Sequence, residues 1–156
     1  LYNYAVILSN CQKNNESNIY LDKVLMHMNT SYIWILKGNN YKNRNNYQEA
    51  LKCYTHASEI VPNRIFPLYK TMLLYKEYNR YNQMIDTAEL INKFNIKIPS
   101  YTTLKIKKEA NEIISIYNNK KRNHNVTNNY HFCFFNQYYE TKFIHTIFSL
   151  KELLFV

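Results

Sequence analysis

The chain has little of several residues on which common functional sites depend. Its 156 residues include one Gly, three Pro and three Cys. A phosphate-binding loop needs several positions without a Cβ, so one glycine excludes P-loop and dinucleotide-binding fingerprints. Collagen-like and Gly-Ser linker classes are excluded for the same reason. A hydrophobic fraction of 46% at this length is enough to bury a core, and we expect one ordered domain of average size.

The chain also lacks a run of apolar residues long enough to span a membrane, and it has no basic leader with a small-residue cleavage site. It begins with Leu1 instead of Met, and we expect it to be a piece of a longer protein. Cys11, Cys53 and Cys133 lie far apart without a CxxC pair, and an odd number argues against a complete disulfide framework. We interpret them as free thiols, with Cys11 and Cys53 buried as small apolar residues.

Arginine is scarce in an otherwise basic chain. The formal charge is +9, but only four of the 20 basic residues are Arg, and the lysines are spread along the chain with one short cluster at residues 120–122. Bidentate Arg contacts are the usual means of specific nucleic-acid recognition. Lys, Asn, Ile, Tyr and Phe are all abundant, and their codons are rich in A and T. The composition therefore favours a solvated lysine surface over a nucleic-acid-binding patch.

One segment of the chain carries a regular set of landmarks. It runs from Ser31 to Arg64 and reads SYIWILKGNNYKNRNNYQEALKCYTHASEIVPNR. The landmarks are Trp34, Gly38, Tyr41, Ala50, Tyr54, Ala57 and Pro62. Their spacing resembles the tetratricopeptide repeat, in which a first helix (helix A) carries Trp, Gly and Tyr, a second (helix B) carries Ala, an aromatic and Ala, and Pro follows. Lys37 departs from the pattern, which prefers Leu there.

The residue types suit two closely packed helices. Gly38 and Ala50 are small, so we expect helix A and helix B to approach each other there, with Tyr41 and Tyr54 filling the space around them. Pro62 has no N–H and restrains the preceding residue, so helix B must end before it. The Asn-rich residues 43–46 predict the turn between the helices.

The landmarks predict two further, more divergent units. A shift by one full repeat toward the C-terminus, which maps Trp34 to Leu68, places apolar residues at the landmarks, with large and small sizes partly exchanged: Leu68, Met72, Tyr75, Met84, Ala88 and Ile91. In the other direction, a shorter shift that maps Trp34 to Tyr4 gives a weaker match: Tyr4, Leu8, Cys11, Tyr20, Leu21 and Val24. Three units are about the minimum for a self-supporting stack. The sequence thus predicts an all-α fold, a solenoid of about three tetratricopeptide-like helical hairpins.

After the third unit, the sequence predicts a capping helix and then a different kind of segment. Ser100 is a candidate N-cap for a helix over residues 101–117 that covers the end of the stack. The apolar face expected for it comprises Leu104, Ile106, Ala110, Ile113, Ile114 and Ile116. We therefore expect a repeat domain over residues 1–117. Residues 118–156 form a basic and then aromatic-rich tail, which either packs on the stack with an amphipathic helix at 143–156, is poorly ordered, or is not native coding sequence.

Signals for catalysis, cofactors and metal binding are weak. His131 and Cys133 could ligate a metal, but no second pair at zinc-like spacing accompanies them. Cys53 lies on a helix whose apolar face should bury it, which disfavours a Cys–His dyad. We predict no catalytic, cofactor-binding or metal-binding residue. We interpret the chain as a non-enzymatic module.

The remaining candidate site is the groove lined by the helices A of successive units. Its outward positions are predicted to be Tyr32, Ile35, Asn39 and Lys42 in one helix and Phe66, Tyr69, Leu73 and Lys76 in the next. Aromatic rings beside Asn and Lys could hold an extended acidic peptide or a sugar. The alternative is that these are ordinary solvated or inter-repeat positions. A protein or peptide partner in this concave groove is the partner that we predict.

A second resemblance rests on residues 62–110. The motifs are Pro62-Asn63-Arg64, Pro67-Leu68-Tyr69, Lys97-Ile98-Pro99-Ser100 and Ile106-Lys107-Lys108-Glu109-Ala110. This stretch resembles the C-terminal tetratricopeptide tail of O-antigen ligase-like membrane proteins of the Bacteroidetes, over roughly residues 1–116. The resemblance implies a non-catalytic accessory module attached to a parent membrane domain of surface-polysaccharide assembly. It would then be the soluble segment of a bacterial inner-membrane protein, whereas a free-standing cytoplasmic adaptor and a basic nucleic-acid binder are the alternatives.

Overall fold

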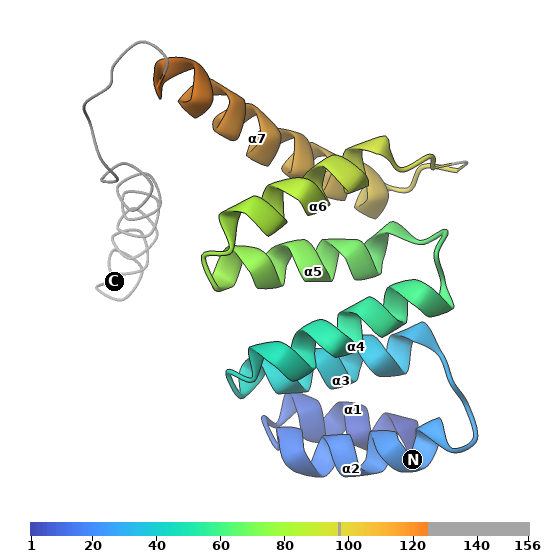
Figure 1. Ribbon diagram of the computed structural model, residues 1–156. Coiled ribbons are helices and arrows are strands. Elements are labelled where there is room, and N and C mark those ends of the chain that lie inside the picture. The colour runs from blue at the N-terminus through green and yellow to red at the C-terminus, as the bar shows by residue number, and fades with distance from the viewer. Residues whose placement is uncertain (97, 125–156) are drawn as a thin grey trace, which may run out of the picture. The chain divides into compact units, whose positions relative to one another are not determined.

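The computed structural model of the chain describes residues 1–96 and 98–124, with side chains up to residue 119. This part of the chain contains helices and no strand, which confirms the predicted all-α class (Figure 1). The helices are α1 (Tyr2–Asn10), α2 (Asn14–Leu25), α3 (Ser31–Asn43), α4 (Tyr47–Ile60), α5 (Ile65–Glu77), α6 (Tyr81–Lys93) and α7 (Tyr101–His124).

The chain divides into two compact units, residues 1–119 and residues 120–156. Most of the second unit, from residue 125 on, lies outside the described residues. The predictions for the tail therefore fall outside them too, namely its helix at 143–156 and the residues His131 and Cys133. Apart from the end of α7, the elements and contacts described below belong to the first unit.

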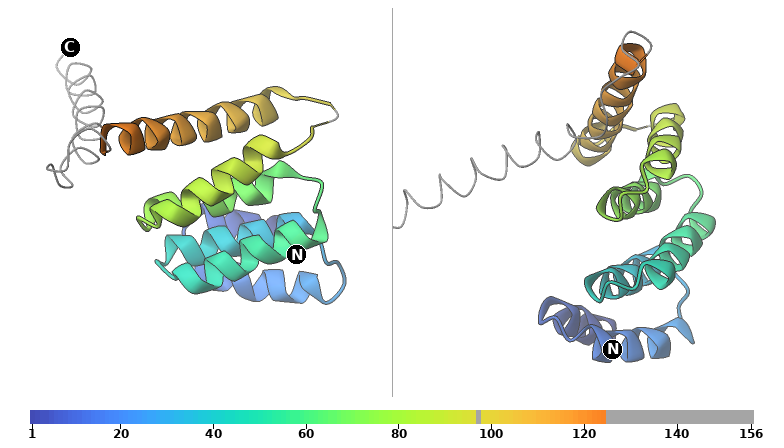
Figure 2. Two further views of the ribbon diagram at one scale, coloured as in Figure 1. Left: turned by 45° about the horizontal axis from the view of Figure 1, so that its top comes forward. Right: turned by 60° about the vertical axis from the view of Figure 1, so that its left-hand side comes forward.

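The first unit is a stack of helical hairpins. Helices α1 and α2, α3 and α4, and α5 and α6 pack in pairs, and each pair contacts the next through α2 with α3 and α4 with α5 (Figures 1 and 2). This is the predicted tetratricopeptide-like solenoid. Helices α1, α3 and α5 occupy the place of helix A, and α2, α4 and α6 that of helix B. Helix α4 ends at Ile60, just before Pro62, as expected from the missing N–H of proline.

The turns inside the three hairpins have the same backbone structure. Gln12, Asn45 and Asn79 each adopt a positive φ, of 61°, 57° and 55°. The residue after each of them donates its N–H to a carbonyl in the last turn of helix A: Lys13 to Leu8, Asn46 to Tyr41 and Arg80 to Tyr75. A left-handed residue followed by such a hydrogen bond is a common way to end a helix. The turns therefore give the register of the repeats independently of side-chain type.

This register confirms the prediction for the third unit and corrects that for the first. Asn79 follows Asn45 at the spacing predicted for the third unit, and the residues at its landmarks Met72, Met84 and Ala88 are buried. Gln12 takes the place of Asn45 in the first unit, a register that aligns Leu1, and not Tyr4, with Trp34. The shift predicted for the first unit is therefore wrong. It aligned the aromatic ring of Tyr4 with Trp34, whereas the close helix contact is determined by the small residues.

In the register set by the turns, the first unit has small side chains where the second has them. Ala5 takes the place of Gly38, Ser17 that of Ala50, and Leu21 that of Tyr54, and all three are completely buried. The hydroxyl of Ser17 donates to the carbonyl oxygen of Ala5 at 2.8 Å, across the contact between α1 and α2. The match is not apparent in the sequence because Ser17 is polar, whereas Ala50 at the same place is apolar.

The second and third hairpins place the large and the small side chain of the same contact on opposite helices. A Cβ on Gly38 would lie 2.5 Å from Cε1 of Tyr54, so the tyrosine ring occupies the space that the glycine leaves. In the third hairpin the large residue is Met72 on helix A and the small one is Ala88 on helix B, both fully buried in one apolar cluster. Close packing of the same space explains this exchange.

Helix α7 follows the third hairpin, as the sequence predicts. Ser100 caps it, because the N–H of Thr103 donates to Ser100 Oγ at 3.2 Å and the N–H of Ser100 donates to Thr103 Oγ1 at 2.8 Å. Ile106, Ala110 and Ile113 are buried in one cluster with residues of α5 and α6. Their spacing of four and three residues forms one stripe of the helix.

Two details of the predicted helix are wrong. It extends to His124 instead of residue 117, because residues 118–124 contain no Gly or Pro to end it. Leu104 and Ile116, which were expected on its apolar face, are exposed. The buried stripe of α7 is narrower than predicted.

Candidate interaction surface

Six predicted groove residues lie on α3 and α5 and are exposed or half-buried. We call them the helix-A face; they are Tyr32, Asn39, Lys42, Phe66, Tyr69 and Lys76. Ile35, which was also expected to point outward, is buried. It lies four residues after Ser31 and three before Gly38, both buried, so it shares their side of α3. Leu73 is half-buried and packs against the apolar cluster of α5, α6 and α7.

Ionic and hydrogen-bonding contacts connect successive helices across this face. Lys42 Nζ on α3 lies 3.0 Å from Glu77 Oε2 on α5. The hydroxyl of Tyr69 on α5 donates to Glu109 Oε2 on α7 at 2.8 Å, and Lys76 Nζ lies 3.9 Å from the other oxygen of Glu109. Burial, together with Glu109, raises the pKa of Tyr69 to about 12. The two lysines of the predicted groove therefore already have carboxylate partners.

Asn39 serves the packing of the repeat. Its Oδ1 accepts a hydrogen bond of 2.8 Å from the hydroxyl of Tyr54, the buried landmark of helix α4. Burial raises the pKa of the Tyr54 hydroxyl, so it remains a donor at every ordinary pH. Asn39 thus satisfies a hydroxyl that would otherwise be buried without a partner.

Two cations that the sequence analysis missed complete the face. The guanidinium of Arg64 donates to the hydroxyl of Tyr32 and lies 5.3 Å from the centre of its ring. Lys70 Nζ lies 5.5 Å from the ring centre of Phe66. We call these four residues the cation–aromatic cluster. Among the described residues, neither Arg64 nor Lys70 has a carboxylate within salt-bridge distance, so this cluster carries uncompensated positive charge.

The surroundings of Lys70 disfavour the positive charge of its ammonium group. Burial, and then the positive charge of Lys42, lower the pKa of Lys70. A carboxylate placed beside it would oppose both effects. Arg64 precedes α5, so helical periodicity does not reveal it, and Lys70 stands at the position of Leu36, which is not one of the repeat landmarks. These positions explain why the pattern alone did not indicate them.

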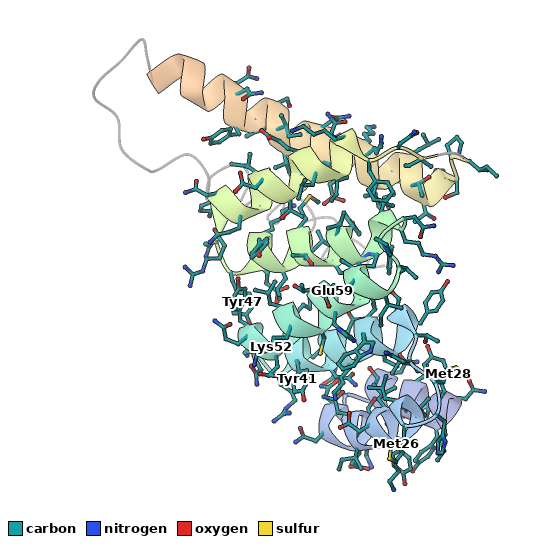
Figure 3. The ribbon with its side chains drawn as sticks, turned by 45° about the vertical axis from the view of Figure 1, so that its right-hand side comes forward. Met26, Met28, Tyr41, Tyr47, Lys52 and Glu59 are labelled. Carbon is teal, nitrogen blue, oxygen red and sulfur yellow. The ribbon has the colours of Figure 1, made fainter. Side chains whose placement is uncertain are left out.

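Two hollows lie elsewhere on the described surface. One of about 690 Å³ lies between the turns of the second and third hairpins and is lined by Asn45, Asn46, Tyr47, Gln48, Tyr78, Asn79 and Arg80. The other, of about 670 Å³, follows α3 and α4 and is lined in part by Trp34, Tyr41, Lys52 and Glu59. Figure 3 labels Tyr47 of the first hollow and Tyr41, Lys52 and Glu59 of the second. No residue of the helix-A face lines either hollow.

The cysteines differ in their surroundings. Cys53 is buried, and burial raises the pKa of its thiol to about 11, so the thiolate needed of a nucleophile is scarce near neutral pH. Cys11, predicted to be buried, is exposed because it lies at the end of α1, where the chain turns toward α2.

Over residues 1–96 and 98–124, His, Cys, Asp and Glu side chains do not gather in groups of three or more that could hold a metal ion. In the same ranges, no helix has both the length and the hydrophobicity required to cross a membrane.

Comparison with known proteins agrees with the architecture. A search of curated proteins found no match to the chain. Residues 31–64 match the family model of the tetratricopeptide repeat, over the same boundaries that the landmarks predicted. The matched segment comprises α3, α4 and the connection to α5. The chain is therefore a helical-repeat protein that carries a tetratricopeptide repeat at residues 31–64.

Proposed function

We propose that the chain is a non-catalytic interaction module that binds an extended acidic peptide segment of a partner protein across α3 and α5. Tetratricopeptide repeats commonly form extended binding surfaces from stacked helices. The observation that supports this peptide chemistry is the cation–aromatic cluster. It offers two cations without carboxylate partners, each beside an aromatic ring of the same face.

The arrangement suits a carboxylate next to an apolar or aromatic side chain. Arg64 can receive a carboxylate through its planar fork while the exposed ring of Tyr32 provides an apolar contact beside it. Lys70 and Phe66 offer the same combination farther along α5. Lys42 and Lys76 are held by Glu77 and Glu109, and we expect them to contribute little to the attraction.

A binding titration tests this proposal. The probe is a short fluorescent peptide that alternates Glu with Phe and Ala, and its reference is the same peptide with Gln in place of Glu. We expect Arg64→Gln and Lys70→Gln each to weaken binding of the Glu peptide about tenfold, a loss of about 1.4 kcal/mol. The Gln peptide should bind weakly to every variant.

Arg80→Gln is the matched control. Arg80 also lies over a tyrosine ring, at 6.0 Å from the ring centre of Tyr47, but away from the helix-A face. Equal losses from Arg64→Gln, Lys70→Gln and Arg80→Gln would show that only net charge matters, and the proposal would then fail. A single-stranded oligonucleotide that binds more tightly than the peptide, with a steep dependence on salt, would instead support the basic nucleic-acid-binding alternative.

A narrower proposal concerns the parent protein. The resemblance of residues 62–110 to the tail of O-antigen ligase-like membrane proteins supports a role as the accessory module of such a protein, next to a parent membrane domain. The proposal rests on the sequence motifs within residues 62–110. The genomic reading frame upstream of Leu1 tests it: several membrane-spanning segments in frame would support the ligase-like parent, and a nearby start codon would support a free-standing adaptor.

A further inference from the structure

One stripe of each helix A faces the preceding hairpin; the repeat register identifies it in α3 and α5, and burial against α6 identifies it in α7. In α3 the stripe is Ile33, Lys37 and Asn40; in α5 it is Pro67, Thr71 and Leu74; and in α7 it is Ile106, Ala110 and Ile113. Apart from Lys37, whose side chain is 13% exposed, these residues are all buried. Each stripe has the same spacing of four and three residues.

The helix that covers the stripe is in each case the preceding helix B. Asn40 donates hydrogen bonds to Ser17 and Asn18 of α2. Leu74 forms an apolar cluster with Ala50 and Tyr54 of α4. The stripe of α7 belongs to the cluster that contains buried residues of α6. Helix α1 has the same stripe, which comprises Tyr4 and Ile7, but no preceding helix within the described residues covers it; among these residues, the ring of Tyr4 contacts only that of Tyr20 on α2, with ring centres 4.8 Å apart.

Exposure separates α1 sharply from the other three helices. Ile7 is 57% exposed and Tyr4 is 48% exposed, whereas Asn40 and Leu74, at the place of Ile7, are both 0% exposed. Cys11 is exposed at the place of Tyr78, which packs on Tyr47 of α4 with ring centres 4.9 Å apart; Arg44, at the same place after α3, is exposed like Cys11. Tyr4 and Ile7 are neighbours on one face of α1, and contiguous exposed apolar side chains mark interaction sites.

We infer that the stripe of α1 is a docking surface for helix B of another tetratricopeptide-type hairpin, supplied by a partner. This surface uses none of the residues of the helix-A face and does not depend on the proposed function. The chemistry of Ile7 also selects the kind of helix. Ile7 is apolar like Leu74 and unlike Asn40, so the helix must resemble α4, with a small residue and an aromatic ring at the places of Ala50 and Tyr54. A helix like α2, with Ser17 and Asn18, would leave its polar groups without partners against Ile7.

A second copy of the chain does not offer such a helix in its described part. The equivalent faces of α2, α4 and α6 are already covered by α3, α5 and α7. The partner must therefore bring a helix B whose face is free. This requirement separates the inference from a simple association of identical chains.

The test supplies that helix in the correct register. Leu1 occupies the repeat position of Leu68. A copy of residues 31–67 fused directly before Leu1 of the full-length chain therefore adds one hairpin in the correct register. Helix B of this added hairpin has the sequence of α4. Cys133→Ala in this chain and Cys53→Ala in the added copy remove the thiols of the tail and of the new hairpin, which leaves exposed Cys11 as the reactive thiol and the original Cys53 buried. We expect a thiol reagent to label Cys11 on the order of tenfold more slowly than in the chain without the added hairpin, and the melting temperature to rise.

Two matched variants isolate the docking contact. Tyr47→Arg in the added copy alone keeps Gly38 and Ala50, which hold that hairpin together, but changes the face that packs on the next helix A, and Ile7→Asp changes the receiving face. Each should restore fast labelling of Cys11. Ile7→Asp in the chain without the added hairpin should leave the melting temperature unchanged, because Ile7 is exposed there.

Three results would overturn the inference. One is equal labelling of Cys11 with the added hairpin and with its Tyr47→Arg form. Another is an added hairpin that contributes no helical signal in circular dichroism, because a complementary face should order it. The third is a dimer of the unextended chain in sedimentation that dissociates on Ile7→Asp, since a second copy would then be the occupant.

Discussion

The contact between α2 and α3 and the contact between α4 and α5 occupy the same place in the repeat but differ in chemistry. At the first, Asn40 is completely buried, and its Nδ2 donates to Ser17 Oγ and to Asn18 Oδ1, both at 2.8 Å. Its Oδ1 accepts from Ser9 Oγ at 2.6 Å. At the second, Leu74 is equally buried and packs against Ala50 and Tyr54. One contact is a network of amides and hydroxyls, and the other is apolar.

This difference shows that the repeat specifies the place of the contact and leaves its chemistry open. The helices approach closely in both cases because helix B offers a small residue, Ser17 or Ala50, at the same position. What must match is the pair of facing groups, since a buried amide needs hydrogen-bond partners and an apolar side chain needs none. The chemistry of each contact therefore favours one order of the hairpins over others, which a fully apolar stack would not do.

The polar contact is also the less complete of the two. Two buried atoms on α2, Asn14 Oδ1 and Asn18 Nδ2, have no hydrogen-bond partner, compared with one at the apolar contact, the hydroxyl oxygen of Tyr78. Unsatisfied buried polar atoms cost free energy relative to water. We therefore expect the first hairpin to be held less firmly on the second than the second is on the third.

Exchanging the chemistry at the apolar contact should have the largest effect. Leu74→Asn removes a buried side chain and leaves an amide facing Ala50 and Tyr54, so we expect the free energy of unfolding to fall by about 4 kcal/mol. Urea denaturation followed by circular dichroism measures this change. Leu90→Asn is the control, because Leu90 is 55% exposed and its replacement should change the free energy by less than about 0.5 kcal/mol. Similar effects from the two variants would contradict the proposed role of Leu74.

The reverse exchange at the polar contact should cost less. Asn40→Leu removes three hydrogen bonds and leaves the groups of Ser17 and Asn18 without their partner, for a loss of about 2 to 3 kcal/mol. The triple variant Asn40→Leu, Ser17→Ala, Asn18→Leu installs the residues found at the second contact, where Leu74, Ala50 and Leu51 stand. We expect it to regain most of the loss. A triple variant less stable than the single one would show that the polar network is not interchangeable with the apolar contact.

The sequence predicts the repeat where identical residue types recur, and fails where equivalent residues differ in chemistry. The second hairpin was identified from Trp34, Gly38 and Ala50 to its boundaries, and the third from apolar residues at the same spacing. The landmarks place the first hairpin in the wrong register because Ser17 stands where a small apolar residue is usual. Periodicity counts apolar residues, so it does not recognise a buried serine whose hydroxyl bonds to a backbone carbonyl.

The candidate surface was less predictable than the fold for a related reason. Helical spacing identifies which residues of α3 and α5 point away from their own hairpin, such as Tyr32 and Lys42. It does not reveal the partner of each residue on the next helix. Glu109 neutralises Lys76 from a helix much later in the chain, and Arg64 joins the face from a loop. Contacts of this kind depend on how hairpins stack, which the sequence pattern does not specify.

Substitutions at the contact between Gly38 and Tyr54 should have the smallest effect on the free energy of unfolding. Gly38→Ala would bring a Cβ within 2.5 Å of Cε1 and 2.7 Å of Cδ1 of Tyr54, for a net loss of about 1 to 2 kcal/mol after the higher helix propensity of alanine. The first hairpin accommodates alanine at this place, with Leu21 opposite Ala5. Tyr54→Leu should therefore relieve Gly38→Ala, so that the double variant is more stable than the sum of the single losses by about 1 kcal/mol.

Tyr54→Phe separates the ring from the hydroxyl in this cycle. It removes the hydrogen bond to Asn39 but keeps the ring carbons that meet the new Cβ, so it should not relieve Gly38→Ala. Relief by leucine and not by phenylalanine would show that ring volume determines the residue at position 38. Equal coupling for both would mean that the hydrogen bond between Tyr54 and Asn39 determines it, and the parallel with Ala5 and Leu21 would lose its physical basis.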